Sequence, residues 1–293
     1  MRFDRFHPTI NLIYFAAVIT CTILFRHPVF LLISFGCSFA YSVKLGGVRA
    51  LRFDLCMLPL ALLFALWYAA FHHFGVTNLA QTWIGNQITL ESLVYGLMLG
   101  CTVASVMMWM SCVHVIFSTD KVVYLFGRLS PRLSLFLAIL LRMTQRIKGQ
   151  ARRVQEAQRA IGRGIHQGNP IRRLRNALRI GSIVLTWTLE SFVTSSDSMR
   201  ARGEPLRGRT AFSIYRFDNR DRALVVTMSA CLSLLMMGVL FHQTRIRCNP
   251  RIQFNRITPL SGVFYAGYLL LCLLPLLLQL WGEWQFQKKR RNL

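Results

Sequence analysis

Acidic residues are scarce in this sequence, and the few near its apolar regions are not placed as ion-transport sites usually are. The 293 residues include 11 Asp and Glu but 35 Lys and Arg, so the formal net charge is +24. Asp54 and Glu91 stand at the ends of apolar runs, where we expect capping or snorkelling rather than burial. The sequence therefore predicts no buried carboxylate for a proton relay.

Motifs for metal binding, catalysis and ATP hydrolysis are also missing. The eight cysteines form no C-x-x-C pair and lie mostly in apolar runs, so we interpret them as packed thiols rather than disulfides or zinc ligands. No H-E-x-x-H motif occurs, and Gly162-Arg163-Gly164 lacks the G-K-[ST] of a phosphate loop. We expect no metal site, no cofactor and no catalytic residue, so another chain would have to hydrolyse any ATP that is used.

Long apolar runs dominate the chain instead. Hydrophobic residues make up 54% of the sequence, and they are segregated in a way that soluble domains do not show. The runs are Ile10–Phe25, Pro28–Val43, Phe53–Phe74, Leu90–Ser118, Leu224–Phe241 and Leu260–Trp281. They predict an all-α, polytopic membrane protein with about six transmembrane helices, although the first two runs are short for a hydrocarbon core of about 30 Å. The first run lacks a small-residue cleavage site, so we expect it to be a retained span.

The charged residues divide the chain into three parts. Residues 1–118 contain about four membrane helices, residues 119–222 form a basic segment, and residues 223–293 contain about two more helices and a basic tail. The basic segment has about 21 Lys and Arg against seven Asp and Glu. It is too long for an ordinary connection between spans, so we expect it to have its own helical structure and a function.

Basic residues also predict the orientation in the membrane. With six spans, the loop that contains Lys44 and Arg49, the basic segment and the tail at Lys288–Arg291 fall on one side, which the positive-inside rule makes the cytoplasm. The uncharged loop Gly75–Thr89 fits the outside. Both termini are then cytoplasmic. One loop disagrees with this orientation, because six spans place its four arginines on the outside: Arg245, Arg247, Arg251 and Arg256.

Two amphipathic helices are predicted in the basic segment. Apolar or small residues recur at helical spacing in two stripes: Ile147, Ala151, Val154 and Ile161 in the first, and Leu185, Leu189, Phe192 and Met199 in the second. The first stripe leads into Gly162-Arg163-Gly164 and the second into Ala201-Arg202-Gly203. Each predicted helix therefore ends in an arginine between two small residues.

These triplets have two interpretations. Glycine ends helices because it tolerates the left-handed conformation, and an arginine at a helix C-terminus is favoured by the helix dipole. Alternatively, the small residues let a partner approach the backbone while the guanidinium reaches into an acidic groove. Because the element occurs twice, we favour contact with a partner that is present in two copies.

The residues of the triplets resemble those of a known family. The stretch "DSMRARG" at Asp197–Gly203 is similar to the Ala-Met-x-Ala-Arg-Gly signature of the T component of energy-coupling factor transporters, the EcfT/CbiQ family. Upstream, "EAQRAIGRG" resembles the first X-Arg-X motif of that family, and the "FHPTINLI" start before the first span also fits. The resemblance implies that two triplets contact ATPases: Gly162, Arg163 and Gly164, and Ala201, Arg202 and Gly203. Arg159 is the alternative arginine for the first motif.

The resemblance also implies partners and a mechanism. Two ABC-type ATPase subunits would bind the coupling helices, and a small membrane S subunit would bind a vitamin or a transition-metal ion for uptake across the cell membrane of a prokaryote. Closure of the ATPases on ATP would move the arginine-tipped helix ends, and the helices would transmit this motion to the membrane. The chain itself would be a non-catalytic coupling subunit.

Two other classes of function stay open. A secondary transporter or channel would need its own substrate site, usually marked by intramembrane charges or broken helices. A membrane-anchored binder of nucleic acid or anionic lipid would use clusters such as Arg172-Arg173-x-Arg175 against phosphates. The simplest interpretation of that cluster is contact with anionic lipid headgroups on the positive-inside face, and we expect no nucleic-acid partner.

Overall fold

A computed structural model describes residues 3–72, 75, 77–81, 87–167, 169–203, 215, 217–241, 243–244 and 258–291. The elements in these ranges are η1 (Phe3–Arg5), α1 (Pro8–Leu24), α2 (Pro28–Gly46), α3 (Val48–Phe71), β1 (Asn78–Gln81), β2 (Gln87–Thr89), α4 (Leu90–Ile116), α5 (Thr119–Leu129), α6 (Pro131–Ala160), α7 (Pro170–Ala201), α8 (Asn219–Leu240) and α9 (Pro259–Arg291). Helices α2, α3, α4, α8 and α9 are long and apolar enough to cross a membrane, and α1 is an apolar helix of 17 residues. The predicted helical, polytopic membrane architecture is confirmed, with one short antiparallel hairpin, β1–β2, in the uncharged loop.

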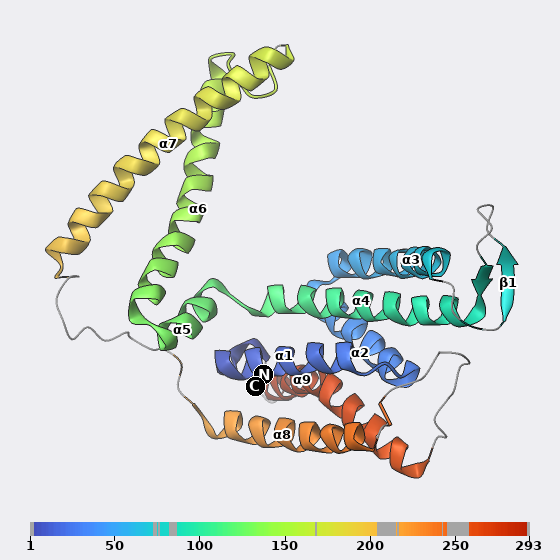
Figure 1. Ribbon diagram of the computed structural model, residues 1–293. Helices are drawn as coiled ribbons and strands as arrows, with labels where there is room; N and C mark the ends of the chain where they lie inside the picture. The colour runs from blue at the N-terminus through green and yellow to red at the C-terminus, as the bar shows by residue number, and fades with distance from the viewer. Residues whose placement is uncertain are drawn as a thin grey trace. The chain divides into compact units, whose positions relative to one another are not determined.

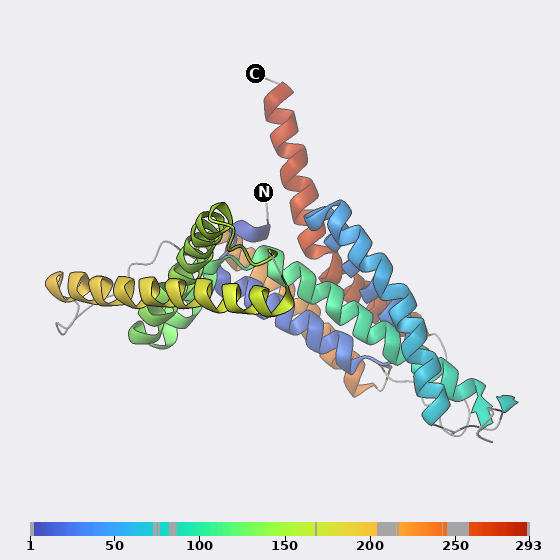
Figure 2. The ribbon, with the colours of Figure 1, turned by 90° about the horizontal axis from the view of Figure 1, so that it is seen from above.

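The chain forms two compact units, which are described separately (Figures 1 and 2). Unit 1 contains Met1–Ser118 and Tyr215–Leu293, and unit 2 contains Thr119–Ile214. The apolar helices from both ends of the chain therefore build one bundle, while most of the basic segment folds separately.

The helices of unit 1 begin where side chains satisfy their first free N–H groups. His7 and His27 each precede a proline at the first helical position. Each accepts, on Nδ1, a hydrogen bond of 3.3 Å from the backbone N–H two residues further on. Helix α8 begins with a capping box made by Asp218 and Asp221. The polar residues between the apolar runs thus set the helix boundaries.

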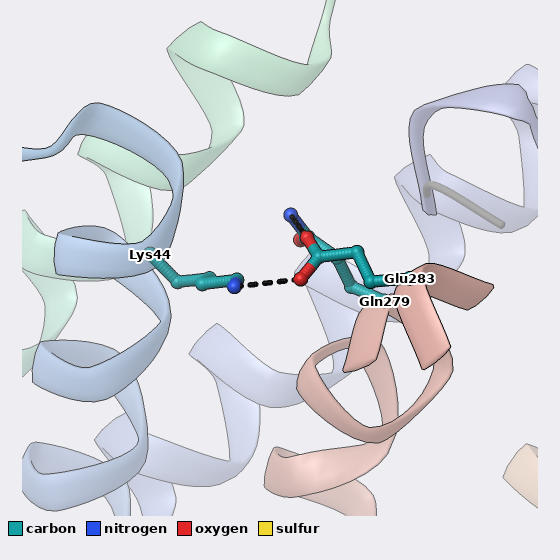
Figure 3. Close-up of polar contacts among 3 residues, drawn as sticks. All are labelled: Lys44, Gln279 and Glu283. Atoms are coloured by element: carbon teal, nitrogen blue, oxygen red, sulfur yellow. Dashed lines mark hydrogen bonds and ion pairs between the residues drawn. The ribbon is translucent and has the colours of Figure 1, made fainter. Parts of the chain in front are cut away.

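Polar contacts join helix termini at one end of unit 1. The pairs are His7 N–H with Asp221 Oδ1 at 3.4 Å, Ser42 Oγ with Asp54 Oδ1 at 3.2 Å, and Lys44 Nζ with Glu283 Oε2 at 2.8 Å. Figure 3 shows the last pair, where Gln279 also donates to Glu283 from one turn earlier on α9. These contacts bring together the beginnings of α1, α3 and α8 with the ends of α2 and α9.

A second set of contacts joins helix termini at the other end. Arg26, between α1 and α2, donates to Tyr95 OH of α4 at 2.9 Å. His27 Nε2 lies 3.3 Å from Tyr265 OH, near the beginning of α9. The residues just before and just after α1 therefore contribute to both sets of contacts, although the helix has 17 residues. Its shortness does not remove it from the bundle.

Aromatic rings and a small network of hydroxyl groups fill the centre of unit 1. Tyr14, Trp109 and Tyr268 have no exposed surface. Thr22 Oγ1 lies 2.9 Å from Ser34 Oγ and 3.0 Å from Tyr268 OH, and Trp109 Nε1 donates to Ser34 Oγ at 3.1 Å. These buried polar atoms are therefore paired, as an apolar bundle requires.

Small residues allow α3 and α4 to pack closely. A Cβ atom on Gly100 of α4 would stand 2.5 Å from the carbonyl oxygen of Ala61 on α3. A Cβ atom on Gly96 would stand 2.9 Å from the carbonyl oxygen of Ala65. This spacing of small residues at i and i+4 on both helices is the pattern by which membrane helices approach each other.

Large apolar side chains cover the outward face of the bundle. On α3, Leu63 and Leu66 are each 64% exposed and Phe71 is 67% exposed. A protein that meets water on this face would not leave such a contiguous apolar surface. Lipid or another apolar surface therefore covers it.

Both carboxylates at the ends of apolar runs are buried, contrary to the prediction. Asp54 is 0% exposed and Glu91 is 4% exposed. Glu91, in the first turn of α4, accepts a hydrogen bond of 2.7 Å from Thr77 Oγ1. Asp54 accepts from Ser42, but its Oδ2 has no hydrogen-bond partner in the described part of the chain. The expectation of snorkelling was wrong for Asp54 because α3 begins at Val48, so this residue lies well inside the helix.

The cysteines are free thiols wherever they are described. Cys21, Cys37, Cys112 and Cys272 are buried, whereas Cys56 is exposed on α3. Cys248 lies outside the described residues, together with the four arginines of the loop that disagreed with the predicted orientation. Among the described residues, no three His, Cys, Asp or Glu side chains are grouped so that they could hold a metal ion.

Candidate functional site

Unit 2 presents the two predicted triplets at the ends of a long helical hairpin. Helices α6 and α7 contain 30 and 32 residues and run in opposite directions, joined by residues 161–169. Figure 1 shows that they lie together near this connection and separate towards their other ends. At 1.5 Å per residue, the length of α7 places Arg163 and Arg202 about 45–50 Å apart. The hairpin can therefore contact two places on a partner assembly at once.

The first triplet begins at a glycine that ends α6. Gly162 has φ of 77°, and its N–H donates to the carbonyl of Arg159 at 3.1 Å. The N–H of Arg163 donates to the carbonyl of Gln158 at 2.8 Å. These two bonds form a Schellman motif, in which glycine supplies the left-handed residue. Arg163 is thus the second residue beyond the C-cap, which is Ile161.

The second triplet includes the last residue of α7 and its cap. Helix α7 ends at Ala201, Arg202 is the C-cap, and Gly203 has φ of 78°. The N–H of Gly203 donates to the carbonyl of Arg200 at 3.0 Å. Both glycines therefore stop their helices, as the first interpretation of the triplets requires.

The two triplets do not occupy equivalent positions at these caps. When the left-handed glycines are matched, Gly162 corresponds to Gly203, and Ile161 corresponds to Arg202. Arg159 then corresponds to Arg200, and Arg163 lies two residues beyond the position of Arg202. The sequence spacing could not reveal this offset because it depends on which glycine adopts the positive φ.

Gly164 is fixed inside the connection between the helices. It is buried, its N–H donates to Gln167 Oε1 at 2.8 Å, and its carbonyl accepts from Asn176 Nδ2 at 3.2 Å. A Cβ atom there would stand 3.4 Å from both Cβ and Cγ of Arg159. The side chain of Arg159 therefore covers Gly164, while Arg163 is held at the tip by a well-defined backbone.

The arginines of the site have free charged groups. Arg159, Arg163 and Arg202 are all exposed, and none of them forms an ion pair with any described residue. Ala201 and Gly162 are exposed as well, so no bulky side chain in these triplets obstructs a partner. Each helix end can thus deliver one guanidinium into a pocket with little steric hindrance.

The two amphipathic stripes have different environments. In the first, Val154 is only 8% exposed, but Ile161 lies beyond the helix and is 67% exposed. In the second, Leu185 and Leu189 are 62% and 57% exposed, and Phe192 is 37% exposed. The exposed face also continues toward the beginning of α7 through Ile171, Leu174 and Leu178. The second stripe therefore faces outward and offers an apolar surface along most of α7.

Unit 1 contains a second feature that the sequence did not reveal. A cavity of about 330 Å³ lies between α2, α3 and α4 and is lined by residues that include Ser42, Arg49 and Cys112. Ser42 is also the hydrogen-bond donor to the buried Asp54. The sequence signals for this cavity were polar residues such as Ser42 and Ser111 within apolar runs, and such residues do not by themselves indicate a cavity.

The chain was compared with known proteins. No protein-family model and no curated protein matches it. The membrane character follows from the helices, and the role of the two triplets remains a prediction from the sequence.

Proposed function

We propose that this chain is the transmembrane coupling subunit of an ATP-driven importer of the energy-coupling factor type. In this proposal, two ABC-type ATPase subunits bind the hairpin of α6 and α7, one at Arg163 and one at Arg202. A small membrane subunit binds the substrate, a vitamin or a transition-metal ion. The chain hydrolyses no ATP itself and links the two activities mechanically.

One observation carries the proposal: two exposed arginines, neither of which forms an ion pair with a described residue, stand at opposite ends of one helical hairpin. A guanidinium that enters an acidic pocket forms charge-assisted hydrogen bonds in a fixed geometry, so it can transmit force between subunits. Removing one partner of a buried ion pair typically costs on the order of 3–5 kcal/mol. A separation of about 45–50 Å along α7 lets the two arginines reach two copies of a partner.

The hairpin suits a mechanical role. Helices α6 and α7 are continuous over 30 and 32 residues, and the connection between them is fixed by Gly164. A continuous helix transmits displacement because its backbone hydrogen bonds resist bending and stretching. When the ATPases move toward each other on ATP, both ends of the hairpin would move with them.

The proposal also includes an orientation. The end of unit 1 that holds Lys44 and Glu283 also holds Arg49, Arg220 and the basic end of α9. The positive-inside rule makes this end cytoplasmic. The chain leaves unit 1 after α4 and returns to it before α8, both at this end, so the basic hairpin would meet ATPases in the cytoplasm.

The buried Asp54 favours a second candidate, transport through this chain itself. An ionisable side chain inside a membrane helix is a candidate ion-binding residue, and Asp54 has one oxygen without a hydrogen-bond partner among the described residues. Purified chain alone in proteoliposomes separates the two candidates. Ion uptake that Asp54→Asn abolishes would favour autonomous transport, whereas the coupling proposal predicts no uptake without partner subunits.

The proposed function is tested by purifying the tagged chain from its native host in mild detergent and identifying the co-purifying subunits by mass. We expect two ABC-type ATPases and a small membrane protein whose identity names the substrate. A chain that purifies alone under conditions in which it stays folded contradicts the proposal.

A further inference from the structure

A groove between α6 and α7 is lined by arginines, by apolar side chains of both helices and by hydroxyl side chains of α7. Its volume is about 710 Å³, and Arg202 belongs to its lining. Leu135, Ile139 and Met143 of α6 provide apolar surface on one side, and Trp187 and Met199 of α7 provide it on the other. Arg202 is also the proposed coupling arginine. A partner that receives Arg202 in a pocket would therefore lie next to this groove.

The groove has two further arginines. Arg142 and Arg146 are one helical turn apart on α6, so they project from the same face. Both side chains are exposed, and within the described part of unit 2 neither forms an ion pair. Glu190 is the one acidic residue in the lining, against three arginines. The lining therefore has an excess of positive charge that a partner can neutralise.

The dimensions and chemistry of the groove fit a helix better than a small anion. The lining extends from Leu135 to Gln150 on α6 and from Trp187 to Arg202 on α7, which corresponds to about 22 Å on each helix. A small anion would use the arginines but leave the apolar side chains of the lining uncovered. An amphipathic helix covers those side chains with its apolar face, and its polar face presents carboxylates to the arginines beside the hydroxyl groups of α7.

We propose that this groove binds an acidic amphipathic helix of the ATPase subunit that receives Arg202, with two of its carboxylates facing Arg142 and Arg146. This inference rests on the proposed function and extends it, because it makes Arg142 and Arg146 determinants of partner binding. Helix α7 then contributes a tip contact through Arg202 and a lateral contact through the groove.

Site-specific photo-cross-linking in the full chain, expressed with its native partners, tests this inference. A cross-linking amino acid replaces Ser195, which lines the groove, and a second variant carries it at Arg200, an exposed residue in the last turn of α7 outside both the groove and the triplet. We expect both positions to form adducts with the ATPase. Arg142→Glu/Arg146→Glu should lower the adduct at position 195 by at least about tenfold, because like charges then face each other. Arg152→Glu/Arg153→Glu is the matched control on exposed residues of α6 outside the groove, and it should leave the adduct unchanged.

The outcomes separate this inference from the proposed function. An ATPase adduct at position 200 without one at 195 contradicts the groove inference and leaves the coupling role intact. An adduct at 195 with phospholipid, or an ATPase adduct that resists the double charge reversal, also overturns it. No ATPase adduct at either position contradicts both proposals.

Discussion

Arg163 and Arg202 are presented by different backbone geometry, although the sequence makes their triplets look alike. Arg202 is the C-cap of α7, directly before a left-handed glycine, whereas Arg163 directly follows one. Arg159 is exposed too, but its side-chain stem lies against Gly164. The structure thus gives Arg163 more freedom than Arg159 to enter a pocket on a partner.

The first prediction distinguishes these two arginines. Arg163→Glu should lower co-purification of the ATPase by at least about tenfold, because a reversed charge would meet an acidic pocket. Arg159→Glu should change it by less than about twofold, as expected for an exposed charge outside the contact. The measurement is quantitative mass spectrometry of the purified complex, and the opposite order of effects would transfer the contact to Arg159.

The second prediction concerns His27, which lies outside the membrane-spanning segments. Burial lowers the pKa of its imidazole, whose neutral form accepts the N-cap hydrogen bond from Val29. As the pH falls below about 6.5, the unfolded chain binds a proton before the folded chain does, so stability falls. Above that pH this contribution to stability is fully present.

His27→Asn provides the matched variant, because asparagine caps helices without titrating in this range. Thermal unfolding in detergent, measured between pH 5.5 and 8, should show a smaller loss of stability at low pH for the variant than for the native chain. Equal pH dependence in both proteins would exclude His27 as its source.

At the scale of elements, the contact between α3 and α4 depends on residues without side chains. The Cβ of any residue at position 100 would meet the backbone carbonyl of Ala61, which cannot move without shifting α3. The apolar character of the two helices could be predicted from the sequence. Their close approach could not, because glycines and alanines are frequent in such runs for several reasons.

The third prediction tests this contact. Gly100→Ala should destabilise unit 1 by about 1–3 kcal/mol through overpacking. Gly36→Ala is the control, because nothing lies within 4 Å of the added Cβ, and alanine has the higher helix propensity. Thermal unfolding in detergent should rank Gly100→Ala below the native chain and Gly36→Ala at or above it. Equal stability of the two variants would contradict the proposed close packing.

The fourth prediction concerns the ion pair between α2 and α9. Lys44 and Glu283 are 37% and 44% exposed, so water and salt screen their attraction. A double-mutant cycle with Lys44→Met and Glu283→Gln should give a coupling free energy below about 1 kcal/mol. A value well above that would mean that the pair holds α9 in place rather than only marking where the two helices meet.

At the scale of the whole molecule, apolar runs sufficed to predict a polytopic bundle, because each run is longer than any soluble strand or loop tolerates. They did not reveal that α1 has contacts at both ends of unit 1, since those contacts join residues such as His7 and Asp221, 214 positions apart. The apolar runs also led to the wrong expectation that Asp54 would not be buried. Its burial depends on α3 beginning before the apolar run, and hydropathy does not report helix starts.

The candidate site was only partly predictable from the sequence. The arginine triplets mark helix ends, and both do lie at the ends of α6 and α7. The distance between them along one hairpin could be found only once the helix lengths were known. The groove beside Arg202 could be found only from the way in which α6 and α7 diverge. A sequence stripe such as Leu185, Leu189 and Phe192 cannot show whether it faces a neighbouring helix or the outside.

The most direct test of the coupling role is the Arg163→Glu/Arg202→Glu double variant, purified beside the native chain from the host that supplies the partners. Both ATPases should be lost from the variant, while membrane insertion and the small membrane subunit are retained. The Arg152→Glu/Arg153→Glu variant, with the same change in charge, should keep its ATPases. Retention of both ATPases when Arg163 and Arg202 are reversed would contradict the coupling role and leave the two triplets as helix ends.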